Sequence, residues 1–462
     1  MNDKRIDSFI EYFSNKLISG KASFFIGSGI SRNSGYVGWG DLLKDLASEI
    51  GLDVDRETDL ITLAQYYVNK KERTTINEAI KLSFSDEVGE PNLIHNLICT
   101  LANDSIWTTN YDSLIERQLD MLRIQYSIIT NDKSYINVSN GSKIHVHKIH
   151  GTYDNPAECV LTRNDYEDFK MTNDIVLSNL KSEMCTKSFL FIGYSFSDTD
   201  INHIFTKIRQ IYNRNKPAKH FCIMKKICRA NYTEEAEYRY AQTKEQHYIE
   251  DMNRNGIEVI LVDEFSEISD LLIKIRKKVL SKNILISGCY DEENEEISRF
   301  ISKLSSKLIK KGYKIVTGFG KNVGNNVVEG FFSGCYSTYK YPILKFDDVI
   351  KIVPFPFKKV TENTAEVYLQ LRKNMASITT KQIIIGGIKN EKVSNGVYEE
   401  YRICKENGNI IIPIYSTCGA AKQIWDEEYP FWENDSNFMM LKTEFDDEKV
   451  IDAIFNILNK GE

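Results

Sequence analysis

The sequence predicts an α/β protein with two parallel-sheet domains, and three observations lead to this fold class. First, 462 residues exceed what one hydrophobic core comfortably serves, so two domains are expected. Second, apolar runs that end in glycine or a polar turn alternate with segments of helical periodicity. Third, this pattern stops at a helix with a basic end and then starts again. We place the boundary near Ser281, with domains at 1–281 and 282–462.

The first domain opens with an amphipathic helix and continues with six strand-like runs. The helix, within residues 1–20, repeats apolar side chains at helical spacing and favours docking on a core or an oligomer interface over a membrane surface. Helices are expected between strands, as at 39–50 and 58–68. The expected strands and the turns that end them are 22–29, 105–112, 143–151, 188–198, 219–224 and 256–263. In a parallel sheet, binding residues gather at the carboxyl ends of such strands.

The second domain repeats this plan after a connecting helix at 267–282. A strand from 283 reaches a first glycine turn, a helix with one apolar face follows, and a second strand runs into a glycine turn at 317–320. Residues 381–416 then read as strand, glycine turn, helix and strand. The second half is therefore expected to be a Rossmann-like domain in its own right.

Composition excludes several classes of protein. The net charge of −6 gives no basic footprint for nucleic acid. The nine cysteines contain no C-x-x-C pair, which argues against a zinc knuckle and a disulfide framework and favours a reducing cytoplasm. The first residues contain no apolar run long enough for a signal peptide or a membrane span. Small ligands and protein partners are the expected binding classes.

Two polar turns of the first domain suggest contact with a nucleotide. Gly27-Ser28-Gly29, with Ser31 close behind, begins like a phosphate-binding turn, although Arg32 stands where a third glycine belongs. A purely structural tight turn explains these glycines about as well. Asn110 and Asp112 end the next strand, where they could cap a helix or could hydrogen-bond a ribose hydroxyl or orient a water.

Two further turns end strands in the same way. His150 precedes Gly151 at a strand terminus, which makes a general base and a structural histidine about equally plausible. His145 and His147 share a strand face, but no carboxylate or cysteine lies at ligand spacing, so metal is not expected. Gly193, Ser195 and Asp198 follow another strand, where Ser and Asp could simply cap a helix.

Taken in order, the four turns resemble the NAD-binding core of the SIR2 (sirtuin) family. The resemblance implies that Asn110 and His150 are catalytic, the latter as a base on ribose. It implies substrate contacts from Gly27, Ser28, Gly29, Ser31, Asp112, Gly193, Ser195 and Asp198. The zinc module of deacylating sirtuins and their G-I-P-x-F-R segment are missing, the latter replaced by "SGYVGW". This puts peptide deacylation in doubt and favours cleavage of NAD to nicotinamide and ADP-ribose without zinc or another cofactor.

The glycine turns of the second domain resemble the SLOG family, which binds nucleotides or nucleotide-derived signals. Basic Arg372 and Lys389 could neutralise phosphates, and Glu399 and Glu400 partly match the family's G-G…E-E pattern, although they could equally lie on a solvated helix face. The expected effector-binding residues are Ser287, Gly288, Gly318, Gly320, Arg372, Gly386, Gly387, Lys389, Glu399 and Glu400.

A SIR2 domain joined to a SLOG domain resembles the NADase effectors of Thoeris anti-phage defence. This resemblance implies that a cyclic ADP-ribose isomer made by a TIR-domain partner activates NAD depletion, in a homotetramer or larger assembly in the cytoplasm, without nucleic acid or membrane. Two alternatives stay open. One is a protein deacylase or ADP-ribosyltransferase, and the other is a non-catalytic nucleotide-binding scaffold in which Asn110 and His150 are only turn and core residues.

Overall fold

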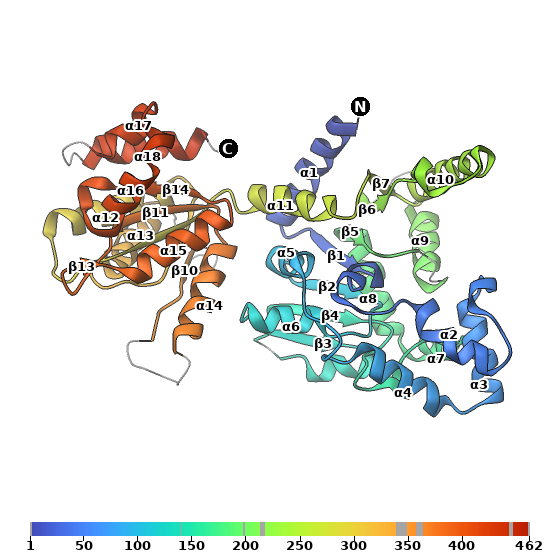
Figure 1. Ribbon diagram of the computed structural model, residues 1–462. Helices are drawn as coiled ribbons and strands as arrows, with labels where there is room; N and C mark the ends of the chain where they lie inside the picture. The colour runs from blue at the N-terminus through green and yellow to red at the C-terminus, as the bar shows by residue number, and fades with distance from the viewer. Residues whose placement is uncertain are drawn as a thin grey trace. The chain divides into compact units, whose positions relative to one another are not determined.

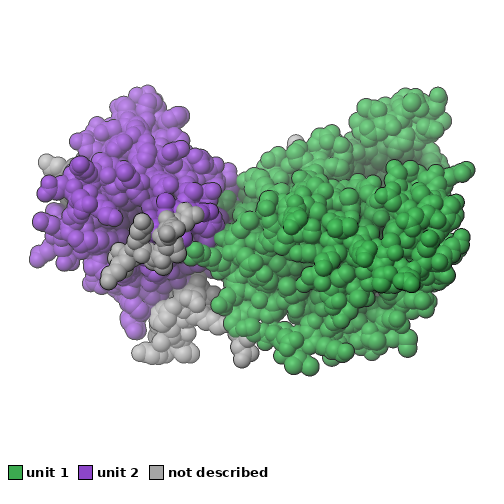
Figure 2. All heavy atoms as spheres, turned by 60° about the horizontal axis from the view of Figure 1, so that its bottom comes forward, with its two compact units in different colours: residues 1–276 green, residues 277–462 purple. Residues whose placement is uncertain are grey.

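The computed structural model describes residues 2–139, 141–196, 199–212, 218–338, 349–356, 364–442 and 447–460 (Figure 1). The chain divides into two compact units, Met1–Arg276 and Lys277–Glu462, which Figure 2 colours separately. The division falls inside α11 (Glu267–Val279), the helix that the sequence analysis takes as the connection.

The first unit is built on a parallel sheet with the strand order β3-β4-β2-β1-β5-β6-β7. Its strands are β1 (Ala22–Ile26), β2 (Ser105–Thr108), β3 (Tyr126–Ile129), β4 (Ile144–Lys148), β5 (Ser188–Ile192), β6 (His220–Lys225) and β7 (Ile257–Val262). Six of these confirm the six predicted strands. The seventh, β3, is a short and partly exposed edge strand, and it was not predicted.

Helices precede, connect and follow these strands (Figure 1). They are α1 (Asn2–Ile18), α2 (Trp39–Glu49), α3 (Leu60–Lys70), α4 (Arg73–Phe84), α5 (Leu93–Leu101), α6 (Leu114–Met121), α7 (Arg163–Thr172), α8 (Asp174–Thr186), α9 (Thr199–Tyr212), α10 (Glu235–Arg254) and α11. The apolar face predicted for α1 packs on the sheet of its own unit. The Phe9 ring lies 4.8 Å from that of Phe221, and the Phe13 ring lies 5.7 Å from that of Phe24.

The chain order places a topological switch point at β1. The chain leaves β1 for β2 on one side, while β5 pairs with β1 on the other side. Ligands of open parallel sheets bind at such a point, outside the carboxyl ends of the strands. The register aligns Ile26 with both Thr108 and Ile192, so the turns that follow β1, β2 and β5 start at the same level.

The second unit contains a five-stranded parallel sheet with the order β10-β9-β8-β11-β14. Its strands are β8 (Asn283–Cys289), β9 (Lys314–Thr317), β10 (Ile350–Ile352), β11 (Lys381–Gly386) and β14 (Ile410–Pro413). Strand β10 and the small antiparallel pair of β12 (Ile388–Lys389) with β13 (Lys392–Val393) were not predicted. Among the described residues the helices are α12 (Glu295–Lys310), α13 (Gly324–Thr338), α14 (Thr364–Ser377), α15 (Asn395–Glu406), α16 (Gly419–Trp432), α17 (Ser436–Met440) and α18 (Asp447–Lys460).

Apolar side chains cover both faces of this second sheet. One core combines strand residues such as Ile383 with α12 and α18, and the other combines residues such as Ile384 with α15 and α16. Successive residues of β11 thus point into opposite cores, as in a sheet buried on both faces. In the described part of the chain, no helix has both the length and the apolar character needed to cross a membrane.

Candidate active site

A cavity of about 1170 Å³ lies at the carboxyl ends of the first sheet's strands. Ligand pockets commonly measure about 300–1,000 Å³, so a dinucleotide-sized molecule has room here. The structure brings together every described residue that the sequence analysis assigns to NAD. These lining residues are Gly27, Ser28, Gly29, Ser31, Asn110, Asp112, His150, Gly193 and Ser195. The tenth, Asp198, lies outside the described residues.

The glycine turns after β1 and β5 pack directly against each other. The Gly27 N–H donates to Ile192 O at 2.9 Å, and the Gly29 N–H donates to Gly193 O at 3.0 Å. A Cβ atom at Gly27 would lie 2.3 Å from Gly193 O, which no side chain can tolerate. Gly193 itself has φ +66°, a conformation that favours glycine. This close approach explains the glycines without any ligand, so their contact with phosphate stays a prediction.

A chain of three buried polar side chains crosses the floor of the cavity. Asn110 Nδ2 donates to Ser31 Oγ at 3.1 Å, and Ser31 Oγ donates to Asp112 Oδ2 at 2.9 Å. Asp112 Oδ1 accepts from the N–H of Leu114, the first residue of α6, although the N-cap position of this helix is held by Ser113. Asn110 is 6 % exposed, and its Oδ1 has no hydrogen-bond partner among the described residues. A buried oxygen without a partner is costly, which suggests that a ligand or water completes it.

His150 stands beside this chain on the neighbouring strand. Residue pairing aligns Thr108 of β2 with Lys148 of β4, and Asn110 and His150 each follow that pair by two residues. The His150 ring is 3 % exposed and lies 5.3 Å from the Tyr166 ring and 6.4 Å from the Trp39 ring. The imidazole therefore meets the cavity between aromatic walls.

The other two histidines of this strand do not reach the cavity lining. The His147 ring stacks on the Trp107 ring with 3.7 Å between ring centroids, and neither residue lines the cavity. Burial, with smaller contributions from His145 and Lys187, lowers the pKa of His147 to about 3, so it is neutral at physiological pH. Across the described residues, no group of three or more His, Cys, Asp or Glu side chains is placed to hold a metal ion.

Several cavity residues were missed by the sequence reasoning. Helix α7 turns one face toward the cavity, and helical periodicity could have predicted this face but not what it contacts; its members are Arg163, Tyr166, Glu167 and Lys170. Trp39 is the last residue of the stretch "SGYVGW", which stands where deacylating sirtuins have their G-I-P-x-F-R segment. The side chain of Arg32, which the sequence left open, lines the cavity and pairs with Asp41 at 3.3 Å, with both side chains largely exposed.

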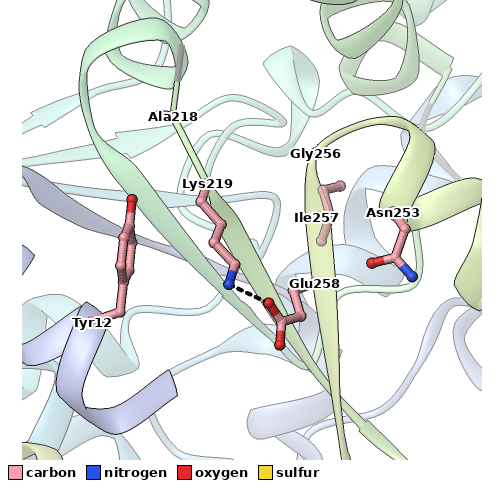
Figure 3. Close-up of a pocket in the computed structure, with 7 residues that line it drawn as sticks. All are labelled: Tyr12, Ala218, Lys219, Asn253, Gly256, Ile257 and Glu258. Carbon is pink, nitrogen blue, oxygen red and sulfur yellow. Dashed lines mark ion pairs between the residues drawn. The ribbon is translucent and has the colours of Figure 1, made fainter. Parts of the chain in front are cut away.

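A second, smaller cavity lies at the opposite edge of the same sheet (Figure 3). It measures about 330 Å³ and is lined near the amino ends of β6 and β7. Lys219 pairs with Glu258, which also accepts from Arg5 of α1 at 3.0 Å. Because both cations pair with Glu258 and the pair from Arg5 fastens α1 to the sheet, this cavity has a structural explanation, and we place the candidate active site at the carboxyl edge.

In the second unit, five of the predicted effector residues form one cluster. Ser287 Oγ donates to the buried Glu400 carboxyl, and Arg372 pairs with Glu399. Arg372 Nε also lies 3.9 Å from Glu400 Oε1. The guanidinium stacks 5.1 Å from the Phe355 ring centre, and the same ring blocks a side chain at Gly318. We call Ser287, Gly318, Arg372, Glu399 and Glu400 the Arg372 cluster.

The remaining predicted effector residues lie in neighbouring turns. Gly288, Gly320, Gly386 and Gly387 sit where a Cβ atom would strike backbone or side-chain atoms at 2.0–2.6 Å. Gly386 has φ +63° and lies against the Tyr290 ring. Lys389 is exposed in β12, and among the described residues no hydrogen bond or ion pair joins it to Arg372. These glycines thus have packing reasons, and their contact with an effector stays a prediction.

Glu400 should make the stability of this protein depend on pH. Burial raises its pKa from 4.5 to about 7, opposed by the Ser287 hydrogen bond and by Arg372 and assisted by Glu399. A carboxyl that binds its proton more tightly when folded contributes stability below its unfolded pKa and loses that contribution as pH rises through 7. We expect wild type to lose about 3 kcal/mol relative to Glu400→Gln between roughly pH 4.5 and 8. Thermal midpoints of both full chains across this range measure the difference, and a difference that does not vary with pH would contradict the assignment.

Comparisons with known proteins match a family domain to each of the two halves of the chain. Residues 104–249 match the SIR2-like domain, and residues 267–461 match the Sir2- and TIR-associating SLOG family. The NAD(+) hydrolase ThsA of Enterococcus faecium is 33 % identical over 99 % of this chain and 99 % of its own length. The protein of the same name from Bacillus cereus (strain MSX-D12) is 33 % identical, covering 91 % of this chain and 89 % of the relative. That from Cytobacillus dafuensis is 32 % identical, covering 96 % and 92 %.

The fold and the two matches define the class: a SIR2-like unit followed by a SLOG unit in one chain. This confirms the predicted architecture of both halves. Full-length similarity to three relatives of the same name then gives the family. The chain belongs to the ThsA family.

Proposed function

We propose that this protein hydrolyses NAD at the nicotinamide–ribose bond and releases nicotinamide and ADP-ribose. One observation carries the proposal: Asn110 and His150 lie at equivalent positions on adjacent strand ends and line one large cavity. The E. faecium relative, similar over 99 % of this chain, is named an NAD(+) hydrolase. The B. cereus and C. dafuensis relatives carry the same name, so the assignment does not rest on a single relative.

The chemistry needs little from the protein. Nicotinamide is a cationic pyridinium in NAD, so the bond from its nitrogen to ribose C1′ breaks with both electrons going to the ring nitrogen, and neutral nicotinamide leaves without a proton. A water then bonds to C1′ and loses one proton. Unlike ordinary glycoside hydrolysis, no acid has to protonate the leaving group. No metal or cofactor enters this proposal.

Asn110 and His150 fit the two tasks that remain. Because Ser31 accepts from Nδ2, the amide of Asn110 is held with Oδ1 as its available acceptor. That oxygen can accept from a ribose hydroxyl or from the attacking water and so place it at C1′. A neutral imidazole at His150 can take the proton that the water or a ribose hydroxyl releases. The Trp39 and Tyr166 rings beside it help to exclude bulk water.

We further propose that a cyclic ADP-ribose isomer bound at the Arg372 cluster activates this reaction. Arg372 offers a fork of N–H donors that suits a phosphate, and the rings of Phe355 and Tyr368 beside it offer surfaces on which a base can stack. A phosphate there competes with Glu399 for the guanidinium. Bound ligand thereby changes contacts in the second unit, as activation by population shift requires.

The proposed setting follows the family resemblance. The activator is made by a TIR-domain partner, the chain works in the cytoplasm as a homotetramer or larger assembly, and activation depletes cellular NAD during phage infection. An unregulated NAD hydrolase would harm its own cell, so the active state has to be a minor population until the ligand binds.

Nicotinamide release by the purified full chain tests the reaction. We expect NAD to be cleaved to nicotinamide and ADP-ribose, and the rate to rise at least about tenfold when the matching cyclic ADP-ribose isomer is present. An acetyl-lysine peptide in a parallel reaction tests deacylation. Cleavage that requires the peptide would favour the deacylase, and absence of cleavage under all conditions would favour the scaffold.

A further inference from the structure

A buried lysine contacts the backbone of residues in the proposed active site. Lys148 is the last residue of β4, and its side chain is 1 % exposed. Its ammonium donates to Glu116 Oε1 at 2.7 Å and to the backbone carbonyls of Asp112 and, at 3.4 Å, Tyr111. A lysine ammonium has three protons, and here three acceptors receive them.

The acceptors come from the segment that follows Asn110. Tyr111 and Asp112 continue the chain from Asn110, and Glu116 lies in the first turn of α6. Burial raises the pKa of Glu116, while the ammonium of Lys148 opposes that rise. A buried ion pair adds little net stability compared with apolar packing, so stability alone is a weak reason for a charge at this place.

The same lysine is also close to His150 in the sequence. Only Ile149 separates them, and the Ile149 N–H donates to Thr108 O at 3.1 Å, which ties β4 to β2 just before both polar turns begin. Tyr111 is further held by its hydroxyl, which donates to Val160 O at 2.7 Å, while the Val160 N–H donates to His150 O at 2.9 Å. One ammonium thus joins the backbone after Asn110 to the backbone before His150.

We propose that Lys148 is a positioning residue, which holds the amide of Asn110 and the imidazole of His150 at a fixed separation. This inference rests on the proposed NAD hydrolysis and deepens it. Lys148 does not line the cavity, so it acts through the carbonyls of Tyr111 and Asp112 rather than on substrate. A displacement of about 1 Å in a catalytic group can cost about 10²-fold in rate, so a loosened turn should slow the chemical step more than binding.

The test separates positioning from stability. Lys148→Met alone leaves Glu116 buried without its cation and can fail to fold. The double variant Lys148→Met/Glu116→Leu removes both charges and restores an apolar interior, while Glu116→Gln keeps the ammonium and its two carbonyl acceptors. Lys187→Met is the matched control, because Lys187 pairs with Asp104 at 2.8 Å and Glu183 at 3.2 Å near the amino ends of the same sheet.

All variants are compared for cleavage of 1,N6-etheno-NAD under identical conditions. We expect the double variant to melt close to wild type, with kcat about 10 to 100-fold lower and KM within about threefold. Glu116→Gln should lie nearer to wild type, and Lys187→Met should lower the melting temperature and leave kcat unchanged. A double variant with wild-type kcat overturns the inference.

Hydrogen exchange gives a readout that does not depend on turnover. In the double variant we expect amides within residues 109–114 to exchange at least about tenfold faster, with no such change in Lys187→Met. Unchanged exchange there overturns the positioning role whether or not NAD is cleaved. If wild type cleaves no NAD while exchange at 109–114 rises as expected, the proposed function fails and the role of Lys148 in holding this turn stands.

Discussion

Asn110→Ala should reduce nicotinamide release by about 10³-fold while the fold is kept. The variant removes a buried side-chain oxygen of the cavity lining that has no hydrogen-bond partner among the described residues. It also removes a single hydrogen bond to Ser31, which costs about 1 kcal/mol of stability. Nicotinamide release at saturating NAD, with the melting temperature of the same preparation, measures both effects.

Two companion variants sharpen this result. His150→Ala should also lose most of its activity, because the proton acceptor is gone, and combining both changes should add little to the larger single loss. Ser31→Ala leaves the Asn110 oxygen in place but releases the amide to rotate, so a smaller loss of about tenfold is expected. If all three cleave NAD as wild type does, Asn110 and His150 are only turn and core residues, and the catalytic groups lie elsewhere.

Arg372→Met should raise the concentration of the cyclic ADP-ribose isomer needed for half-maximal activation by about 10 to 100-fold. Methionine keeps much of the apolar stem but removes the guanidinium, and hydrogen bonds to charged groups are worth about 1.5–3 kcal/mol, or about 10 to 100-fold in affinity. Titration of the activator against nicotinamide release, together with direct calorimetry of activator binding, measures the change.

Arg402→Met provides the matched control for that experiment. Arg402 is an exposed arginine on α15, the helix that also carries Glu399 and Glu400. It should respond to the activator as wild type does. Arg372→Lys should recover only part of the response, since lysine keeps the charge but not the planar fork. If Arg372→Met is activated by the same concentrations of the isomer as wild type, the effector binds elsewhere in the protein.

The sequence predicts well which turns meet at the carboxyl edge of the first sheet, because the residues that mark these turns are next to one another in the sequence. A strand that ends in glycine or a polar turn is visible in the residues, and parallel strands present their carboxyl ends at one edge, so Gly27, Asn110 and Gly193 were expected to meet. Of the strands that were missed, β3 and β10 are short and lie at the edges of the two larger sheets, where alternation and turn signals are weakest, and β12 and β13 form a separate pair of two residues each.

What escaped prediction depends on partners distant in the chain. Lys148 ends a strand, and a lysine there is ordinarily exposed; its burial requires carbonyls and a carboxylate from the segment 111–116. Helical periodicity could have placed Tyr166 on one face of α7, but only the packing of α7 brings its ring to His150. Gly27 and Gly193 were predicted to contact a nucleotide. In the structure, the close contact between their two turns is what requires glycine.

The hydrogen bonds from Asn110 through Ser31 to Asp112 are complete without any substrate. The reactive amide is therefore preorganised and needs no ligand to orient it. A resting state that retains these bonds has to keep NAD out of the cavity, because its catalytic groups are already assembled. Under the activation proposed above, the effector then acts on the entry of NAD, and it should change KM and the rate of NAD binding before it changes the chemical step.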